Sequence, residues 1–281
     1  MRYILFISFF FFSLILIAQS SYNDVVSSRK EFKYEKPLDL NISDIVILDN
    51  DTLYDNSYRT FDLDFLKKKS YEYPRMLRYY ERIVFCYTTS NPPIKYQLYQ
   101  WNSPIVIFLD PKLPKDVINK FKVFFSSERL KSIINLNISF SKKLKNANYY
   151  IKTIDEDING YDENYEFESV EERENSILTG ITYNLVTDGN NKFHGCLLQI
   201  NPEKMNTKTD LLKKLKQVFF KSLGNFIADN YKDKNSLLHK KYDNSDKISQ
   251  FDLDILKIHY SVIYDQKIYG STFKKLINLT N

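Results

Sequence analysis

The alternation of apolar and polar residues becomes regular only after Trp101. Residues 103–110, SPIVIFLD, form a continuous apolar run of strand length bounded by prolines, which predicts a buried strand. Residues 113–134, LPKDVINKFKVFFSSERLKSII, then repeat apolar positions at helical spacing, which predicts an amphipathic helix. Two further strand-like runs follow at 136–140 and 148–154.

The second half of the chain continues with strands and then helices. Residues 177–201 predict two strands around the turn sequence Asp188-Gly189-Asn190-Asn191. Thr209 is a candidate cap for a helix that reaches about Ala228, and Ser249 is a candidate cap for a last helix to about Tyr264. The predicted fold is therefore α+β, with a twisted mixed sheet of about five strands in the order strand, helix, four strands, helix, helix.

The residues before Trp101 show weaker patterns. Residues 44–49, DIVILD, suit a strand. The segment RMLRYYERIVFC after Pro74 suits a helix, whereas IVFCYTT within the same region suits a strand equally well. We therefore predict an N-terminal extension at residues 21–100, of uncertain structure, before a folded domain at 101–281.

The first twenty residues, MRYILFISFFFFSLILIAQS, resemble a secretory signal peptide. They carry one charge, Arg2, a dense apolar run and small residues at Ala18 and Ser20. A membrane anchor is the alternative, although the run is short for a bilayer span. We expect a secreted or periplasmic protein without a membrane span after cleavage.

Charge is unevenly distributed along the chain. The formal net charge is +5, yet residues 155–174 contain ten acidic residues and one base, Arg173. No aromatic-basic motif accompanies the remaining positive charge, so we expect no nucleic-acid binding. The composition leaves the oligomeric state open.

Cys86 and Cys196 are the only cysteines. A disulfide between them suits an exported protein, but the sequence does not bring their Cα atoms within bridging distance. Alternatively, Cys196 is an inert buried thiol, which we expect to share a strand face with His194.

Three fragments in the predicted order resemble the metzincin zinc-peptidase domain, and its matrixin-type members in particular. Ala147–Ile151 resembles the A-D-I-x-I strand of that family, and the hairpin 180–201 precedes the next helix as its edge strand does. Residues 248–260 resemble the closing helix L-S-x-x-D-I-x-x-I-x-x-L-Y. The resemblance covers residues 101–264, and uncharacterised secreted bacterial families with a degenerate zinc helix are similar too.

The resemblance implies a zinc helix, H-E-x-x-H-x-x-G-x-x-H, at QVFFKSLGNFI. Aligned on Gly224, the three histidines become Gln217, Lys221 and Ile227, and the general-base glutamate becomes Val218. We therefore expect neither zinc nor a catalytic residue here. Ser236-Leu237-Leu238 similarly resembles the S-x-M turn beneath the metal, with Leu238 in place of Met.

The helix also admits a simpler interpretation, as an amphipathic helix with a solvated lysine face. In either case Gln217, Lys221 and Gly224 lie opposite an apolar stripe. The stripe consists of Leu211, Leu212, Leu215, Phe219, Leu223 and Phe226.

Residues 155–166, DEDINGYDENYE, fit the oxygen-ligand spacing of a calcium loop. The side chains of Asp155, Asp157, Asn159 and Glu166 would supply oxygens, with the carbonyl of Tyr161. A solvated acidic loop is the alternative, and calcium is the only cofactor that the sequence predicts.

These observations favour a secreted, catalytically inactive metzincin-like domain that binds an extended peptide or an envelope protein through the former cleft. Lys221 would there replace the charge of the metal. Two other hypotheses remain: a structural protein that acts through residues 21–100, and a metal-dependent hydrolase that uses an unrecognised site.

Overall fold

The computed structural model describes residues 26–27, 45–48, 51–55, 63–72, 75–85, 98–156, 180–189, 191–227, 233–265, 268–270, 273–274 and 277. Contacts between residues divide the chain into two compact units, Met1–Phe61 and Asp62–Asn281. The second unit thus begins well before Trp101, where the sequence placed the start of the folded domain.

The first unit contains a small antiparallel sheet. Its strands β1 (Val26–Ser27), β3 (Asp51–Asp55) and β2 (Ile45–Leu48) lie in that order. The strand predicted within residues 44–49 is therefore present as β2.

The second unit is built on a six-stranded sheet. Its strands are β4 (Gln100–Trp101), β5 (Ile105–Leu109), β6 (Ile138–Phe140), β7 (Tyr149–Thr153), β8 (Ile181–Thr187) and β9 (Lys192–Ile200). The order is β4-β9-β7-β5-β6, and all these neighbours are parallel. Strand β8 pairs with β9 antiparallel. The mixed α+β class is confirmed, and β4 is an additional strand that the sequence did not predict.

Helices lie between the strands and after them in the second unit. They are α5 (Lys115–Phe125), α6 (Glu128–Lys131), α8 (Lys208–Gly224), α9 (Gln250–Lys257) and the π-helix η5 (Ile258–Val262). The single helix predicted over 113–134 is interrupted, because Ser127 takes an extended conformation before α6. The last helix begins after Ser249 as predicted, where the Ser249 hydroxyl accepts a hydrogen bond from the Asp252 N–H at 3.0 Å.

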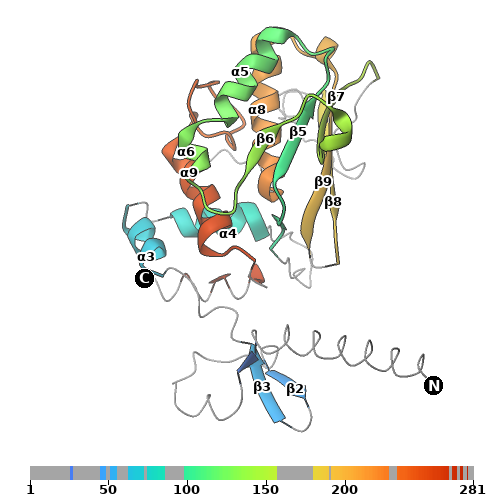
Figure 1. Ribbon diagram of the computed structural model, residues 1–281. Coiled ribbons are helices and arrows are strands. Elements are labelled where there is room, and N and C mark those ends of the chain that lie inside the picture. Colours follow the sequence, from blue (N-terminus) through green and yellow to red (C-terminus); the bar gives the residue numbers. More distant parts are fainter. Residues whose placement is uncertain are drawn as a thin grey trace, which may run out of the picture. The chain divides into compact units, whose positions relative to one another are not determined.

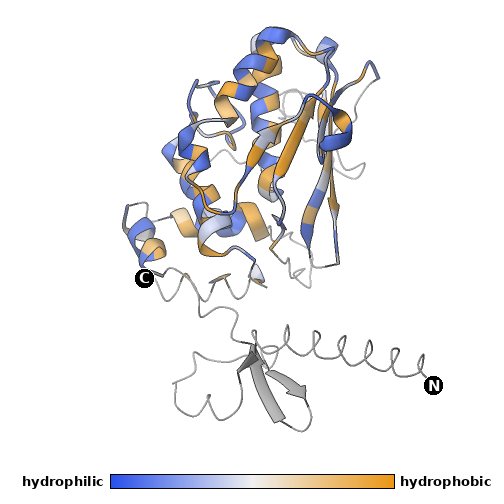
Figure 2. Ribbon diagram, in the orientation of Figure 1, coloured by the Kyte–Doolittle hydropathy of each residue, from blue (hydrophilic) through white to orange (hydrophobic). Residues whose placement is uncertain are grey.

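An aromatic cluster joins α5 and α8 to the sheet, and the two helices lie together beside it (Figure 1). The ring of Phe219 on α8 lies 4.5 Å from Phe125 and 5.3 Å from Phe121 on α5, between ring centroids. On its other side it lies 5.1 Å from Tyr149 on β7. Strand β5 is apolar along its length, whereas the helices alternate between apolar and polar residues (Figure 2). The helices therefore bury one face each against the sheet.

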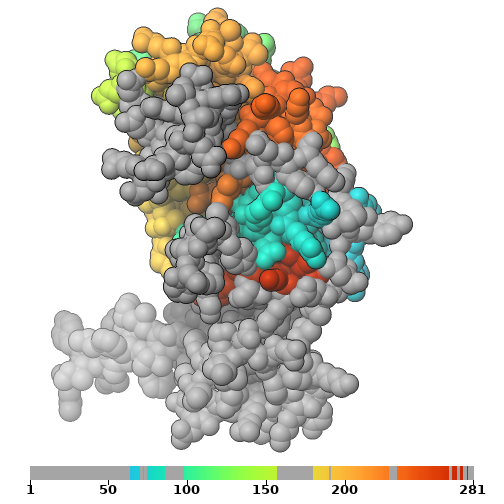
Figure 3. All heavy atoms as spheres, turned by 180° about the vertical axis from the view of Figure 1, so that it is seen from behind, coloured from blue at the N-terminus to red at the C-terminus, as the bar shows by residue number. Residues whose placement is uncertain are grey.

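Two further helices, α3 (Leu63–Glu72) and α4 (Met76–Phe85), belong to the same unit. The helical alternative for the segment after Pro74 is thus confirmed. Tyr80 and Phe85 on α4 contact the ring of Phe273 near the C-terminus, with centroids 5.1 and 5.5 Å apart. Figure 3 shows α4 next to these C-terminal residues.

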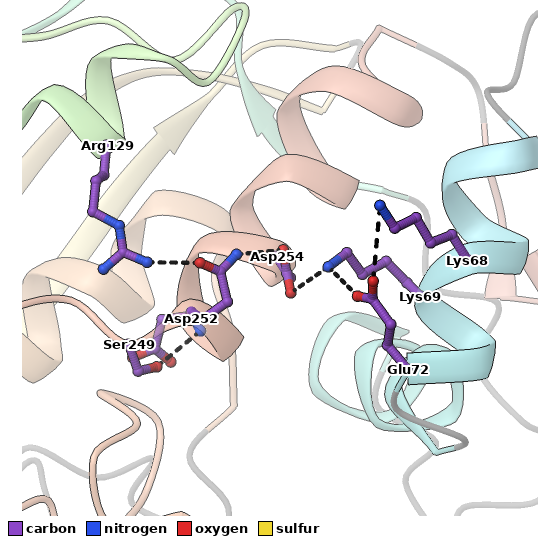
Figure 4. A network of polar contacts seen from close by, with 8 residues as sticks. Lys68, Lys69, Glu72, Arg129, Ser249, Asp252 and Asp254 are labelled. Carbon is purple, nitrogen blue, oxygen red and sulfur yellow. Dashed lines mark hydrogen bonds and ion pairs between the residues drawn. The ribbon is translucent and has the colours of Figure 1, made fainter.

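A polar network also ties α3 to the rest of the unit (Figure 4). The Lys69 ammonium lies 3.0 Å from Asp254 on α9 and 2.6 Å from Glu72. Gln250 connects Asp254 to Arg129 on α6 through hydrogen bonds of 3.0 and 2.7 Å. Burial alone would lower the pKa of Lys69, but its bonds to Glu72 and Asp254 raise it. The boundary of the unit therefore lies before α3, because α3 supplies a buried ion pair.

Candidate functional site

The helix that the resemblance aligns with a zinc helix is α8, and its ends are set by local capping. Thr207 caps its start, since the Thr207 hydroxyl accepts a hydrogen bond from the Asp210 N–H at 3.1 Å. The helix ends at Gly224, because Asn225 adopts the left-handed conformation with φ 50°. The Phe226 N–H then donates to the Lys221 carbonyl at 2.8 Å, as in a Schellman motif. The helix thus starts and stops earlier than Thr209 and Ala228.

Helix α8 is buried on more than one side. The predicted apolar stripe is buried, as are Gln217, Lys221 and Lys216 on other faces. Lys216 has acceptors: its ammonium lies 2.9 Å from the Ser245 carbonyl, 3.2 Å from Asn244 Oδ1 and above the ring of Phe124. The interpretation as a helix with a solvated lysine face is therefore wrong for Lys216 and Lys221.

Gln217, which the resemblance aligns with the first histidine, binds a loop through its side chain. Its amide Nε2 donates to the carbonyls of His239 at 2.8 Å and Leu237 at 3.2 Å. Leu238, which replaces the methionine of the S-x-M turn, is fully buried. The loop that would support a metal is thus fastened to α8 by a neutral side chain.

Asp252 on α9 holds the same loop from the other side. Its Oδ1 accepts a hydrogen bond from the Ser236 hydroxyl at 2.6 Å, and its Oδ2 accepts one from the Leu237 N–H at 2.9 Å. Burial raises the pKa of this carboxyl to about 6, although the hydrogen bonds oppose the shift. The loop is therefore fixed between α8 and α9 by buried polar contacts.

Lys221 is the unusual member of the site. Its side chain is buried, with the residue only 8 % exposed. In the part of the chain that the structure describes, no acceptor, carboxylate or aromatic ring contacts its ammonium group. Burial lowers the pKa of Lys221 to about 8. An ammonium group so placed is poorly solvated, and the described residues offer it no counterion.

Gln217 and Lys221 are four residues apart on α8 and therefore lie on the same side of the helix, and Asn225 follows directly after the helix end. We call these three polar residues the polar row. Asn225 is the end next to strand β8, since its Oδ1 accepts a hydrogen bond from the Tyr183 hydroxyl at 2.9 Å. Lys221 thus lies between a residue bound to the loop and a residue bound to β8.

Strand β8 is an edge strand within the described sheet. It pairs with β9 alone, and Val186 near its end is 51 % exposed. An open edge leaves backbone N–H and C=O groups without partners and can accept another strand. No sequence signal identifies Tyr183, whereas an asparagine directly after a helix is a known C-terminal signal that could have identified Asn225.

Gly224 has a different role from the one that the resemblance implied. The left-handed residue that turns the chain is Asn225, and Gly224 stays in the helix. A Cβ atom at Gly224 would lie 2.8 Å from His259 Nε2 and closer still to the ring of Phe226. Glycine is therefore required by packing. Ile227, at the third ligand position, is 39 % exposed and its N–H donates to the Ile83 carbonyl at 3.0 Å.

We expect Gly224→Ala to lower the free energy of unfolding by about 2 kcal/mol, because Phe226 and His259 would have to move. Urea denaturation followed by circular dichroism measures this change. Gly189→Ala is the matched control, since a Cβ there has open space around it. Equal stability of the two variants would contradict the packing role.

His259, within η5, is packed among aromatic side chains. Its Nδ1 lies 2.7 Å from the Tyr80 hydroxyl, and its ring contacts Phe226 at 5.0 Å between centroids. Burial lowers the pKa of His259 to about 3, so the ring is neutral. Its Nε2 is buried and has no hydrogen-bond partner among the described residues.

The residues at the zinc positions do not fit zinc. The amide of Gln217 is bound to two carbonyls, Lys221 carries an ammonium group, and Ile227 and Val218 have no donor atom. Zinc requires imidazole, thiolate or carboxylate ligands. Over the described ranges, no group of three or more histidine, cysteine or acidic side chains is arranged to hold a metal ion.

The structure describes residues 155 and 156 of the predicted calcium loop. Asp155 is exposed after β7. The other proposed ligands, Asp157, Asn159, Tyr161 and Glu166, lie outside the described residues.

His194 and Cys196 differ in exposure, contrary to the prediction that they share a face. The register between β8 and β9 shifts at Val186/Thr187, so that Val186 pairs with Gly195 and Thr187 with Phe193. His194 is left exposed while Cys196 is buried. Burial raises the pKa of the Cys196 thiol to about 12. Cys196 has a free thiol, and Cys86 lies outside the described residues.

A scan against protein-family models found no match, and a search of curated proteins found no significant match. Within the described helices, none is both long and apolar enough to cross a membrane.

Proposed function

We propose that the second unit is a metzincin-like domain without zinc chemistry, which binds an extended peptide along strand β8. The order of elements supports this proposal. Strand β5 is followed by α5, by strands β6 to β9 and then by α8 and α9. The antiparallel strand lies at the sheet edge beside α8, which agrees with the family resemblance in the sequence.

The observation that carries the proposal is the state of Lys221. A buried ammonium group without a partner destabilises the fold, because its charge has lost hydration and gained no counterion. Such a group adds little to the stability of the fold. Lysines with a perturbed pKa occur often at functional sites. The hydrogen bond between Tyr183 and Asn225 joins β8 to the residue four positions after Lys221, so a strand added to β8 would lie next to this end of α8.

Strand addition provides the binding mode. In antiparallel pairs, the residues that bond to the neighbour alternate with residues whose N–H and C=O groups point away. The Asn201 N–H donates to the Gly180 carbonyl at 2.9 Å, which sets the phase of this alternation. The backbone groups of Ile181, Tyr183 and Leu185 therefore point toward the open edge and can pair with a peptide.

The experiment is selection from a phage-displayed library of random decapeptides on the purified protein. We expect wild-type protein to enrich a consensus, and Leu185→Pro to weaken binding of the consensus peptide at least about tenfold, since proline removes an outward N–H. Lys216→Met is the control, because Lys216 lies on α8 away from the polar row. Failure to enrich any peptide, or unchanged binding by Leu185→Pro, would contradict the proposal.

A further inference from the structure

Lys221 and Lys216 lie on the same helix but meet different surroundings. Both are at least nine-tenths buried. The ammonium of Lys216 has two oxygen acceptors and an aromatic ring, whereas that of Lys221 has no such contact among the described residues. Burial lowers the pKa of both lysines to about 8. The two differ in their contacts, because the ammonium of Lys216 has acceptors within the fold and that of Lys221 has none among the described residues.

The position of Lys221 determines which residue of a bound peptide could contact its ammonium group. Side chains directly opposite each other on neighbouring strands lie on the same face of the sheet. Tyr183 extends from β8 to Asn225 at the end of the polar row. A peptide residue paired with Tyr183 would therefore project toward the face that contains α8 and Lys221, and the next residue would project away.

We infer that Lys221 binds the side-chain carboxylate of an Asp or Glu in the peptide, at the position opposite Tyr183 or two residues from it. This inference rests on the proposed peptide-binding function. One ammonium group matches one carboxylate in charge, and the contact is a charge-assisted hydrogen bond. The neighbours in the polar row, Gln217 and Asn225, are neutral amides and add no second positive charge.

A peptide carboxylate would also relieve the unfavourable burial of Lys221. An opposite charge within hydrogen-bond distance favours the ammonium form. Binding would then raise the pKa of Lys221 from its value near 8. The complex should consequently take up protons at pH 8 to 9, while a peptide bound through its backbone alone should not.

The probe is a positional library of blocked octapeptides, N-acetylated and C-amidated, so that every carboxylate belongs to a side chain. We expect wild-type protein to select Asp or Glu at one position, and replacement of that residue by its amide to weaken binding about tenfold. Lys221→Met should lose this selectivity, and Lys221→Arg should keep it. Lys216→Met should behave as wild type, and thermal melts verify that each variant is folded.

The pH dependence of affinity shows whether the selectivity for an acidic residue comes from the charge of Lys221 or from the shape of the site. Between pH 7 and 9.5 we expect affinity for the acidic peptide to fall at least about tenfold as Lys221 loses its proton, and affinity for the matched amide peptide to stay constant. Acidic selectivity that persists in Lys221→Met would overturn the role of Lys221 while leaving peptide binding intact. Wild-type protein that binds peptides without selecting an acidic residue would likewise overturn the role of Lys221 and leave peptide binding intact. Absence of any peptide binding by wild-type protein would overturn the proposed function as well.

Discussion

Lys221→Met should raise the free energy of unfolding by about 3 kcal/mol at pH 7. The difference between the usual pKa of lysine and a pKa of about 8 corresponds to this amount, at 1.36 kcal/mol for each unit. Methionine has a similar length and no charge, so it removes the desolvated ammonium without leaving a large cavity. Chemical denaturation of the two proteins at pH 7 measures the gain.

The sign of the pH dependence gives a second check on the same residue. The folded pKa of Lys221 is lower than the unfolded one, so the folded protein releases its proton first. The stability of wild-type protein relative to Lys221→Met should therefore rise between pH 8 and about 10.5. Lys216→Met is the comparison, because burial lowers the pKa of Lys216 to about 8 as well, but this substitution, unlike Lys221→Met, removes two acceptor contacts and a cation–π contact. A destabilised Lys221→Met at pH 7 would mean that Lys221 has a partner in the fold.

Asp252→Ala should lower the free energy of unfolding by about 3 kcal/mol, because two buried donors lose their acceptor. These donors are the hydroxyl of Ser236 and the N–H of Leu237. Asp243→Ala is the matched control on the exposed surface, where Asp243 accepts a hydrogen bond from the Ser245 N–H. Its effect should stay below about 1 kcal/mol. Equal effects of the two substitutions, measured by urea denaturation, would contradict the buried network.

The pKa of Asp252 predicts how its contribution to the free energy of unfolding depends on pH. Its folded pKa, near 6, is above the usual value for aspartate of about 3.9. The folded protein holds the proton of Asp252 more tightly than the unfolded chain does. The resulting contribution to the free energy of unfolding is therefore complete below about pH 4 and is lost as the pH rises through 6. Wild-type protein should lose about 3 kcal/mol relative to Asp252→Asn between these limits. A difference independent of pH would show that the carboxyl is solvated.

Much of the fold could be predicted from the sequence because its apolar patterns are strong. The run IVIFL forms the buried strand β5, and Ser249 caps α9 as its spacing with Asp252 indicated. Strand β4 was missed because it has two residues, too few for a periodic signal. The interruption between α5 and α6 was missed because the apolar positions continue across Ser127.

The candidate site was only partly predictable. The apolar periodicity correctly predicted the helix that is now α8, and the alignment on Gly224 stays a prediction. Spacing cannot reveal what the side chains of Gln217 and Lys221 contact. The absence of a described partner for Lys221 depends on loops and strands distant in sequence. The role of Gly224 in accommodating Phe226 and His259 likewise arises from tertiary packing. The link between the polar row and β8 is a tertiary contact, the hydrogen bond from Tyr183 to Asn225, which sequence spacing does not predict.

Amide hydrogen exchange of β8, with and without a bound consensus peptide, tests the central claim most directly. The claim is that a peptide pairs with β8 beside the polar row. We expect the N–H groups of Tyr183 and Leu185 to gain protection on binding, and those of Thr182 and Asn184, which face β9, to change little. Protection confined to other elements, with Tyr183 and Leu185 unchanged at saturation, would contradict the account.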